Sequence, residues 1–279
     1  MSIQRTEELS LRACLNQATL NQTDVQGFIQ AASSAGFQGV EFRIEKLRSY
    51  AASNNTWSQL RELLKVHHME SVCVGSLEEF SYVPSEDFES VLHRAREFAT
   101  VCQQIGCRIL HVAPTPVQKK LQKTKAIEMS ADRLSRIAQV AAEYSVGVGF
   151  EFLAEASAST VHDAVEVLNA TAASNVGLII DTFHCYVGGS TLDEFRDFPL
   201  ERLWIVHFND VEPGQPETLT DEKRLLPGKG VIKLREYERW LKDHGWDGWL
   251  SIEMFRPEYW REDPLQVAKE SFNSLKPYL

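Results

Sequence analysis

The chain has 279 residues, of which 43% are hydrophobic and 24% are charged. This composition is typical of a globular protein with enough apolar residues for a sizeable core. The formal net charge of −10 would repel a phosphate backbone, and no long basic run offsets it. We therefore expect no nucleic-acid partner.

The cysteines and the N-terminal residues bear on cellular location. The five cysteines are odd in number and scattered, without a CxxC motif, which favours reduced thiols over a disulfide framework. The first residues, MSIQRTEELS, lack the basic and apolar regions of a signal peptide. No apolar run approaches the roughly 18 residues of a membrane span. These features predict a cytoplasmic protein with no membrane association.

Short apolar, β-branched runs alternate with longer stretches of helical periodicity along the whole chain. The alternation predicts eight strands, at 11–17, 38–43, 71–76, 107–113, 146–152, 176–181, 202–208 and 248–254. The main helices are expected at 24–35, 57–68, 86–105, 128–144, 160–173, 231–244 and 264–276. The connection after the sixth strand is weaker, and we expect a short helix at 191–198 that ends before Pro199.

Eight strand–helix units can form either a doubly wound open sheet or a closed barrel. A dinucleotide-binding sheet needs a glycine-rich phosphate loop after an early strand, and the sequence has none. No linker or shift in composition divides the chain. We therefore predict an α/β fold, a single (β/α)8 TIM barrel over residues 1–279.

Four successive strands in the second half end in ionisable residues. Glu151 ends the fifth strand, Asp181 the sixth, His207 the seventh and Glu253 the eighth. One such residue alone could be a satisfied core group or a salt-bridge partner. Four at the carboxyl ends of parallel strands meet at the mouth of a barrel, where catalytic groups lie. Three carboxylates there would repel each other unless a cation lay between them, so we predict a metal site.

The predicted ligands are three carboxylates and one imidazole. Oxygen donors with one nitrogen suit a divalent ion such as Mn²⁺, Co²⁺, Mg²⁺ or Zn²⁺. The lack of thiolate ligands argues against a structural zinc site. The sequence therefore predicts one divalent metal ion without selecting among these elements.

Other polar residues fall near this mouth. His184 is expected in the loop three residues after Asp181, and Arg224 in the loop after the seventh strand. Asn16 ends the first strand. Their proximity to the predicted metal favours substrate binding for all three. Asp210 either supports a metal ligand or caps the next turn.

Two further sets of polar residues have structural interpretations. Glu41 and Arg43 share one face of the second strand because side chains alternate along a strand, and we expect them to form an ion pair inside the barrel. His111 lies on the fourth strand, but Ala113 and Pro114 follow it at the mouth. We therefore interpret His111 as a structural residue.

The pattern of strand-end residues resembles the xylose isomerase-like TIM-barrel superfamily of sugar isomerases and epimerases. The shared features are Glu151, Asp181 with His184 in Asp-x-x-His, His207 and Glu253. Within the superfamily the chain resembles the inosose (2-keto-myo-inositol) isomerases of inositol catabolism nearly from end to end. The matching segments are CLNQATL, NVGLIIDTFH, LTDEKRLLPGKGVIKL and SIEMFRPEYW.

The resemblance implies roles for individual residues. The metal ligands of the family match the four strand-end residues, and its paired acid/base glutamates match Glu151 and Glu253. Its substrate-binding histidine and arginine match His184 and Arg224. The segments EFLAEAS and VEPGQPE depart from the family pattern and border the expected site, so they bear on the choice of substrate.

Endonuclease IV, a DNA-repair relative, has a further histidine at the end of the fourth strand. Ala113 stands at that position here. Together with the negative net charge, this argues against a DNA-cleaving function.

These features predict a metal-dependent isomerase or epimerase that acts on a polyhydroxy ketone through an enediolate, with an inosose as the substrate that the resemblance implies. Isomerisation can use one base, whereas epimerisation needs two opposed bases, and the sequence leaves both open. One alternative is a dehydratase of a keto-cyclitol or dehydroshikimate, and another is an isomerase or epimerase of a different ketose or of hydroxypyruvate. A third is a binding protein without catalysis. Tyr259 and Trp260 could pack between subunits of a homo-oligomer or cover the barrel.

Overall fold

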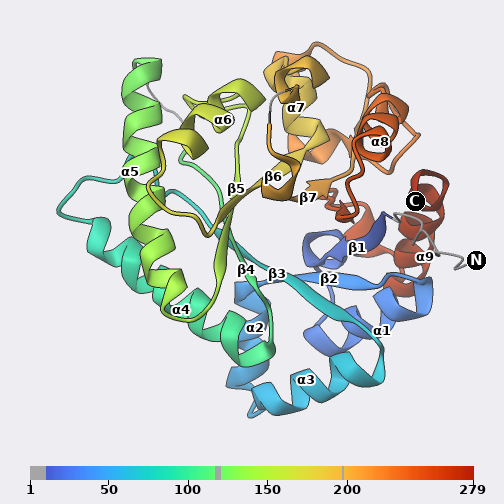
Figure 1. Cartoon of the computed structure of the whole chain (residues 1–279). Helices are drawn as coiled ribbons and strands as arrows, with labels where there is room; N and C mark the ends of the chain where they lie inside the picture. The colour runs from blue at the N-terminus through green and yellow to red at the C-terminus, as the bar shows by residue number, and fades with distance from the viewer. Residues whose placement is uncertain (1–10, 117–120, 197) are drawn as a thin grey trace, which may run out of the picture.

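Eight parallel strands close into a barrel in the computed structural model, which describes residues 11–116, 121–196 and 198–279. Around the barrel the strands follow the order β1-β10-β7-β6-β5-β4-β3-β2 (Figure 1). The barrel strands are β1 (Arg12–Asn16), β2 (Gly39–Arg43), β3 (Glu70–Leu77), β4 (Ile109–Val112), β5 (Gly147–Glu151), β6 (Val176–Asp181), β7 (Leu203–His207) and β10 (Trp249–Ile252). The predicted barrel and all eight predicted strands are confirmed.

Helices surround the barrel on the outside, as Figure 1 shows. They are α1 (Val25–Ala35), α2 (Ile44–Ala52), α3 (Trp57–Val66), α4 (Phe88–Ile105), α5 (Lys123–Ala142), α6 (Val161–Ala170), α7 (Thr182–Gly188), α8 (Leu234–Asp243) and α9 (Pro264–Leu275). Local sequence sets several helix ends. A capping box between Thr56 and Gln59 begins α3, and Gly36, with φ of 110°, ends α1 in the left-handed region that favours glycine.

The connection after β6 differs from the prediction. A helix begins directly at Thr182, and only a 3-10 turn, Leu192–Phe195, lies in the segment expected to be helical; residue 197 of that segment is outside the described residues. The cause is the side chain of Asp181, which caps α7 by accepting a hydrogen bond of 2.7 Å from the N–H of Phe183. His184 therefore lies in the first turns of a helix and not in a loop.

A small antiparallel sheet follows β7, formed by β8 (Asp210–Val211) and β9 (Arg224–Leu225). Asp210 accepts hydrogen bonds from the backbone N–H groups of Gly228, Gly230 and Ile232, at 2.8 to 3.1 Å. These contacts support a capping role for Asp210 over the support of a metal ligand, because they tie the turn after β9 to β8. The sheet thereby fixes the loop that carries Arg224.

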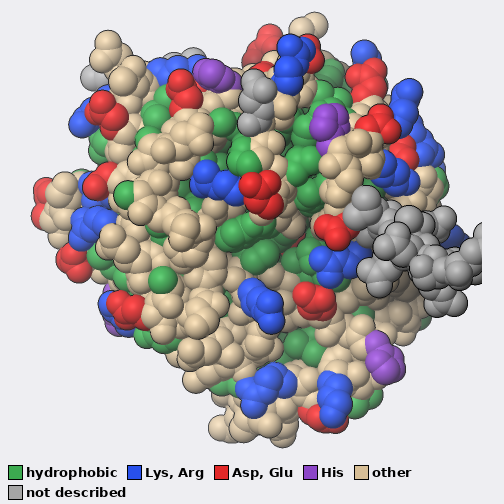
Figure 2. Space-filling model, in the orientation of Figure 1, with side chains coloured by type: hydrophobic (Ala, Val, Ile, Leu, Met, Phe, Trp, Pro, Cys, Tyr) green, Lys and Arg blue, Asp and Glu red, His purple; other side chains and the backbone are tan. Residues whose placement is uncertain are grey.

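The described outer surface carries charged side chains of both signs (Figure 2). On the face in Figure 2, Lys and Arg side chains are scattered among acidic ones, so its described part has no continuous basic surface. Among the described residues no helix is long and apolar enough to cross a bilayer. The indole of Trp260 donates to the carbonyl oxygen of Ala18 at 2.8 Å, so this side chain covers the barrel. The homo-oligomer stays a prediction.

Large aromatic side chains pack against glycines at the amino-terminal ends of the strands. A Cβ atom on Gly177 of β6 would lie 2.2 Å from Trp204 of β7, and one on Gly147 of β5 would lie 2.7 Å from the same indole. Trp249 packs in the same way against Gly39 of β2. Glycine is needed at these positions because the indole rings lie directly on the neighbouring backbone.

This packing predicts the effect of one added methyl group. Gly177→Ala should lower the free energy of unfolding by about 1–3 kcal/mol, because the Cβ atom overpacks the contact with Trp204. Urea denaturation measures the loss. In a Trp204→Leu background the same substitution should cost less than half as much, and an equal cost in both backgrounds would contradict the packing explanation.

Candidate metal centre

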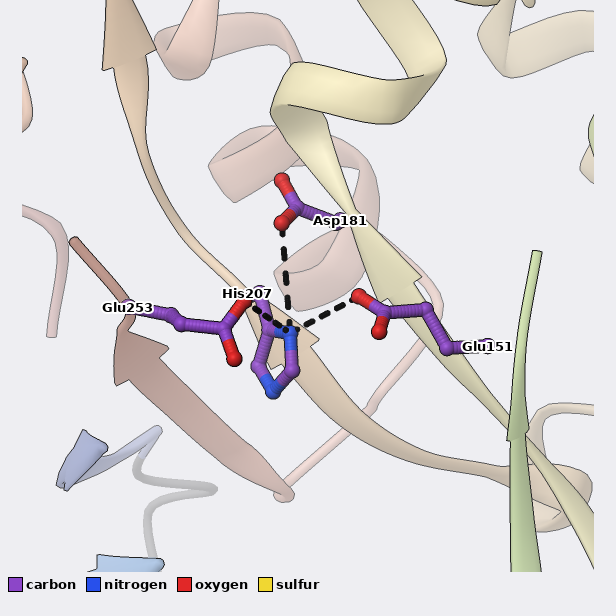
Figure 3. A group of neighbouring side chains, drawn as sticks. All are labelled: Glu151, Asp181, His207 and Glu253. Carbon is purple, nitrogen blue, oxygen red and sulfur yellow. Dashed lines mark hydrogen bonds and ion pairs between the residues drawn. The ribbon is translucent and has the colours of Figure 1, made fainter. Parts of the chain in front are cut away.

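Four side chains converge at the carboxyl-terminal mouth of the barrel (Figure 3). Glu151, Asp181 and His207 are the last residues of β5, β6 and β7, and Glu253 follows β10. One ligand atom from each lies within 4.8 Å of the others. The structure therefore brings together the four residues that the sequence singled out as metal ligands.

The Nδ1 atom of His207 lies at the centre of this group. Its distance is 2.9 Å to Oε1 of Glu151, 3.2 Å to Oε2 of Glu253 and 3.9 Å to Oδ2 of Asp181. All four residues are buried. Three carboxylate oxygens thus face a single imidazole nitrogen, whereas a proton on that nitrogen can make one good hydrogen bond.

Burial and neighbouring charges shift the pKa values of these groups in opposite directions. Burial alone would raise the pKa of Glu151, but His207 and His111 outweigh it and hold the pKa well below its usual value. Burial would likewise lower the pKa of His207, yet Glu253, Glu41 and Glu151 raise it well above its usual value. Glu151 is therefore favoured in its ionised form, in a buried acidic group that attracts positive charge.

The other nitrogen of His207 contacts Glu41, a residue of β2. Its Nε2 atom lies 3.3 Å from Oε1 of Glu41, and the hydroxyl of Ser251 donates to that same carboxylate. When Nε2 carries the proton and donates it to Glu41, the lone pair of Nδ1 is directed at the three carboxylates, an arrangement typical of histidine metal ligands. The donor set, with His207 protonated on Nε2, therefore fits a divalent metal ion.

The predicted ion pair between Glu41 and Arg43 is wrong. Glu41 is buried inside the barrel against His207, while Arg43 at the strand end pairs with Glu45 at 3.6 Å. The two side chains share a face of β2. Arg43, however, lies two residues nearer the mouth than Glu41, where its long side chain reaches solvent. Glu41 therefore belongs to the candidate centre, although the sequence interpretation placed it elsewhere.

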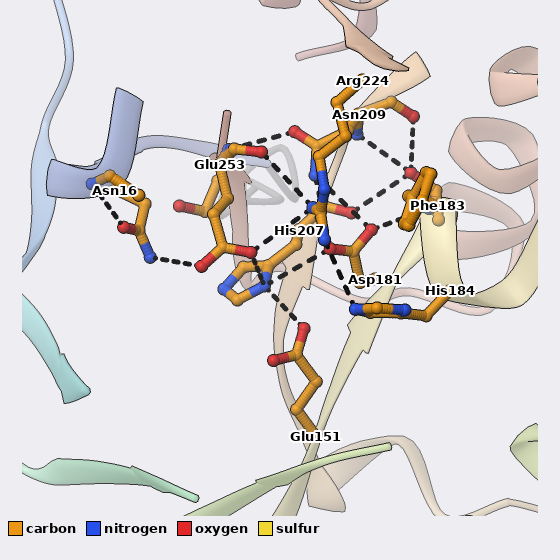
Figure 4. A network of polar contacts seen from close by, with 12 residues as sticks. Asn16, Glu151, Asp181, Phe183, His184, His207, Asn209, Arg224 and Glu253 are labelled. Carbon is orange, nitrogen blue, oxygen red and sulfur yellow. Dashed lines mark hydrogen bonds and ion pairs between the residues drawn. The ribbon is translucent and has the colours of Figure 1, made fainter. Parts of the chain in front are cut away.

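Arg224 is fully buried beside the group (Figure 4). Its guanidinium donates to Asp181 and lies 2.7 Å from Asp221 and 3.4 Å from Glu253. Burial opposes the charge of Arg224, but Asp181, Asp221 and Glu253 outweigh it and raise its pKa. Nε2 of His184 lies 3.3 Å from Nη2 of Arg224, so the two residues expected to bind substrate lie side by side.

Asn16 contacts Glu253 and not the open part of the site. Its Nδ2 donates to Oε1 of Glu253 at 3.1 Å, as Figure 4 shows. Asn209, which the sequence analysis did not consider, contacts two of the four residues: its Oδ1 accepts from the backbone N–H of Glu253 at 3.0 Å, and its Nδ2 lies 3.4 Å from Asp181. A substrate contact for Asn16 stays a prediction.

A cavity of about 230 Å³ opens above these residues. Its lining includes Ser76, Glu78, Glu79, His111, Ala113, Pro114, Pro116, Glu151, Leu153, Glu155, His184, Asp221, Arg224, Glu253 and Phe255. The cavity therefore joins both glutamates of the group to the two residues expected to bind substrate.

His111, which the sequence indicated as a structural residue, lies at the site itself. Its Nε2 lies 2.8 Å from Oε2 of Glu151, and the ring lines the cavity. The signal was present in the alternation of side chains: His111 pairs with Gly149, two residues before Glu151, so both side chains point to the same side of the sheet.

Comparison with known proteins places the chain in a family. The sequence profile of the family described as "Xylose isomerase-like TIM barrel" matches residues 29–278. The chain belongs to this family. The match covers most of the chain and includes all four candidate metal ligands.

Proteins similar to this chain carry out several related reactions. The chain is 26% identical to the inosose isomerase of Bacillus subtilis (strain 168), over 94% of this chain and 96% of the relative. It is 25% identical to a 3-dehydroshikimate dehydratase of Pseudomonas aeruginosa, over 81% of this chain but only 35% of that relative. A D-psicose 3-epimerase of Enterocloster bolteae is 21% identical over 83% of this chain and 77% of the relative.

Solved structures support the same fold. A crystal structure described as IOLI protein with a binding zinc atom matches with a TM-score of 0.91 and 24% identity, over 96% of this chain and 98% of that one. A D-psicose 3-epimerase of Clostridium cellulolyticum H10 with D-tagatose matches with a TM-score of 0.78 and 18% identity, over 96% and 98%. The xylose isomerase-like barrel is therefore established for this chain.

Metal binding should stabilise the folded protein. After removal of metals with a chelator, Mn²⁺ at 100 times its dissociation constant should raise the free energy of unfolding by about 2.7 kcal/mol, because the unfolded chain lacks the converging ligands. Chemical denaturation with and without Mn²⁺ measures the difference.

The control is a change of an exposed histidine. His162→Gln should retain the full stabilisation, since this side chain is 66% exposed and pairs with Glu166 on the surface, whereas Asp181→Asn should lose most of it while retaining a cap for α7. Equal stability of the wild-type protein with and without metal would contradict the metal site.

Proposed function

We propose that this family member is a divalent-metal-dependent isomerase that moves the carbonyl of an uncharged polyhydroxy ketone, an inosose, to the neighbouring carbon. The observation that carries the proposal is the convergence of Glu151, Asp181, His207 and Glu253 around one imidazole nitrogen at a cavity. The similarity to inosose isomerases over nearly the full length supports the substrate. The zinc atom in the IOLI structure supports a metal.

The charges around the cavity support an uncharged substrate. Six of its lining residues are acidic: Glu78, Glu79, Glu151, Glu155, Asp221 and Glu253. Arg224 is the one Lys or Arg among the described lining residues, and it is already paired with Asp181 and Asp221. Such a lining repels phosphates and carboxylates, whereas hydroxyl groups can donate to the carboxylate oxygens. A cavity near 230 Å³ also suits a small molecule.

Isomerisation requires removal of a proton from the carbon beside the ketone. A divalent metal held by the four residues would polarise the carbonyl oxygen and offset the negative charge of the enediolate. Glu151 and Glu253 lie three strands apart around the barrel, and both line the cavity. One glutamate takes the proton from the hydroxyl-bearing carbon, and the same glutamate or the other one delivers a proton to the former carbonyl carbon. The hydroxyl proton passes to the former carbonyl oxygen, so that the atoms balance.

His184 and Arg224 complete the site from the side of α7 and β9. Both line the cavity and are buried, so their N–H groups meet a substrate oxygen in a region with little water. The guanidinium of Arg224 stays charged because three carboxylates surround it. It therefore helps to stabilise the charge that develops on substrate oxygens during proton transfer.

The acid/base role of Glu253 predicts a large loss on a minimal change. Glu253→Gln should lower kcat by about 10²–10⁴-fold, because the amide cannot accept the proton, while the contact with Asn16 is kept. NMR measures the loss as slower entry of solvent deuterium beside the carbonyl of 2-keto-myo-inositol.

The matched control is Glu262→Gln, since Glu262 is exposed and lies outside the cavity. It should leave turnover unchanged. Near-normal deuterium exchange in Glu253→Gln would exclude Glu253 as an acid/base group.

The acidic cavity predicts discrimination by substrate charge. The value of kcat/KM should be at least about 100-fold higher for 2-keto-myo-inositol than for a phosphorylated ketose or 3-dehydroshikimate, because the lining repels anions. Mass spectrometry of the product identifies the reaction. An unchanged mass supports isomerisation, whereas a product lighter by one water molecule would show that the chain is a dehydratase.

A further inference from the structure

The two glutamates of the site have matching contacts. Oε1 of Glu151 faces Nδ1 of His207, and its Oε2 lies 2.8 Å from Nε2 of His111. Oε2 of Glu253 faces the same Nδ1, and its Oε1 accepts from Nδ2 of Asn16 at 3.1 Å. Each carboxylate therefore has one oxygen at the centre and one outer oxygen that contacts a single nitrogen.

The donor on Glu253 is itself fixed in orientation. Oδ1 of Asn16 accepts a hydrogen bond of 2.9 Å from the backbone N–H of Ala18 at the start of a 3-10 turn. This bond requires the oxygen of the amide on the side of Ala18, and so directs the NH₂ group at Glu253. The contact between Asn16 and Glu253 in Figure 4 is thus a hydrogen bond from the NH₂ group to the carboxylate, because the bond to Ala18 fixes the orientation of the amide.

The donor on Glu151 is held by packing. A Cβ atom on Gly75 of β3 would lie 2.7 Å from Nδ1 of His111 and 2.9 Å from its Cβ. The ring therefore lies directly on the backbone of the neighbouring strand, and it meets the ring of His207 edge to face at 5.8 Å. With the ring confined on two sides, Nε2 stays directed at Glu151.

We propose that His111 and Asn16 are positioning residues for the metal centre. Each holds the outer oxygen of one glutamate, so that Glu151 and Glu253 each offer one oxygen to the metal and meet the cavity in one orientation. Without these donors a carboxylate can rotate and bind through both oxygens, as carboxylate ligands do elsewhere. The inference rests on the proposed function, because it assigns the partners of the same ligands.

Two variants of His111 separate the donor from the ring. His111→Phe keeps a ring against Gly75 but removes the donor, and should weaken Mn²⁺ binding by about 10–100-fold. At saturating Mn²⁺ it should also lower kcat for 2-keto-myo-inositol at least tenfold with less than a threefold change in KM. His111→Gln restores an N–H donor and should recover Mn²⁺ affinity to within about threefold of the wild-type value.

Asn16→Ser provides an independent test at the other glutamate. The serine hydroxyl can still cap the turn at Ala18, but it is too short to reach Glu253. The same pattern of weaker Mn²⁺ binding and lower kcat is expected, whereas His162→Gln should leave both unchanged. Isothermal titration calorimetry measures Mn²⁺ affinity, and circular dichroism shows which variants are folded. If His111→Phe does not fold, Asn16→Ser and His111→Gln decide the outcome.

The outcomes distinguish this inference from the proposed function. Wild-type protein that binds no Mn²⁺ and does not turn over 2-keto-myo-inositol would overturn both. A different outcome would overturn the positioning role alone. In that outcome the wild-type protein is active, and the folded variants His111→Phe and Asn16→Ser keep Mn²⁺ affinity and kcat within twofold of the wild-type values. A loss in His111→Phe that His111→Gln does not recover would also overturn it.

Discussion

The burial of three carboxylates around one imidazole nitrogen is the constraint on which the rest of the site depends. Asp181 and His207 are fully buried, and Glu151 and Glu253 nearly so. Buried anions at such short separations repel each other strongly unless positive charge lies among them. In this barrel Arg224 supplies one compensating charge beside Asp181 and Glu253, and the geometry of the four converging residues suits a divalent metal ion.

The surrounding polar residues satisfy these carboxylates without closing the site. Asn209 contacts Asp181 and the backbone of Glu253, and Glu41 fixes the far nitrogen of His207. Asn209 lies just after β7 and Glu41 lies on β2, so the barrel itself sets the geometry. The cavity above remains acidic, which links the charge of the centre to the preference for an uncharged substrate that we propose.

The sequence was informative where the structure depends on local pattern. The apolar runs located every barrel strand, and the ionisable residues that end four of them lie together as expected. Contacts across the barrel were not predictable, because Glu41 of β2 and His207 of β7 lie on strands three steps apart and meet only through the interior. The helix α7 was missed because one capping side chain, Asp181, begins it inside an apolar segment.

The most direct test of the metal centre is a crystal structure of the protein grown with Mn²⁺, with anomalous data that locate manganese. We expect one strong anomalous peak about 2.0–2.3 Å from Nδ1 of His207 and from one oxygen each of Glu151, Asp181 and Glu253. A structure with manganese elsewhere, and with Nδ1 of His207 in direct contact with Glu151, would contradict this prediction.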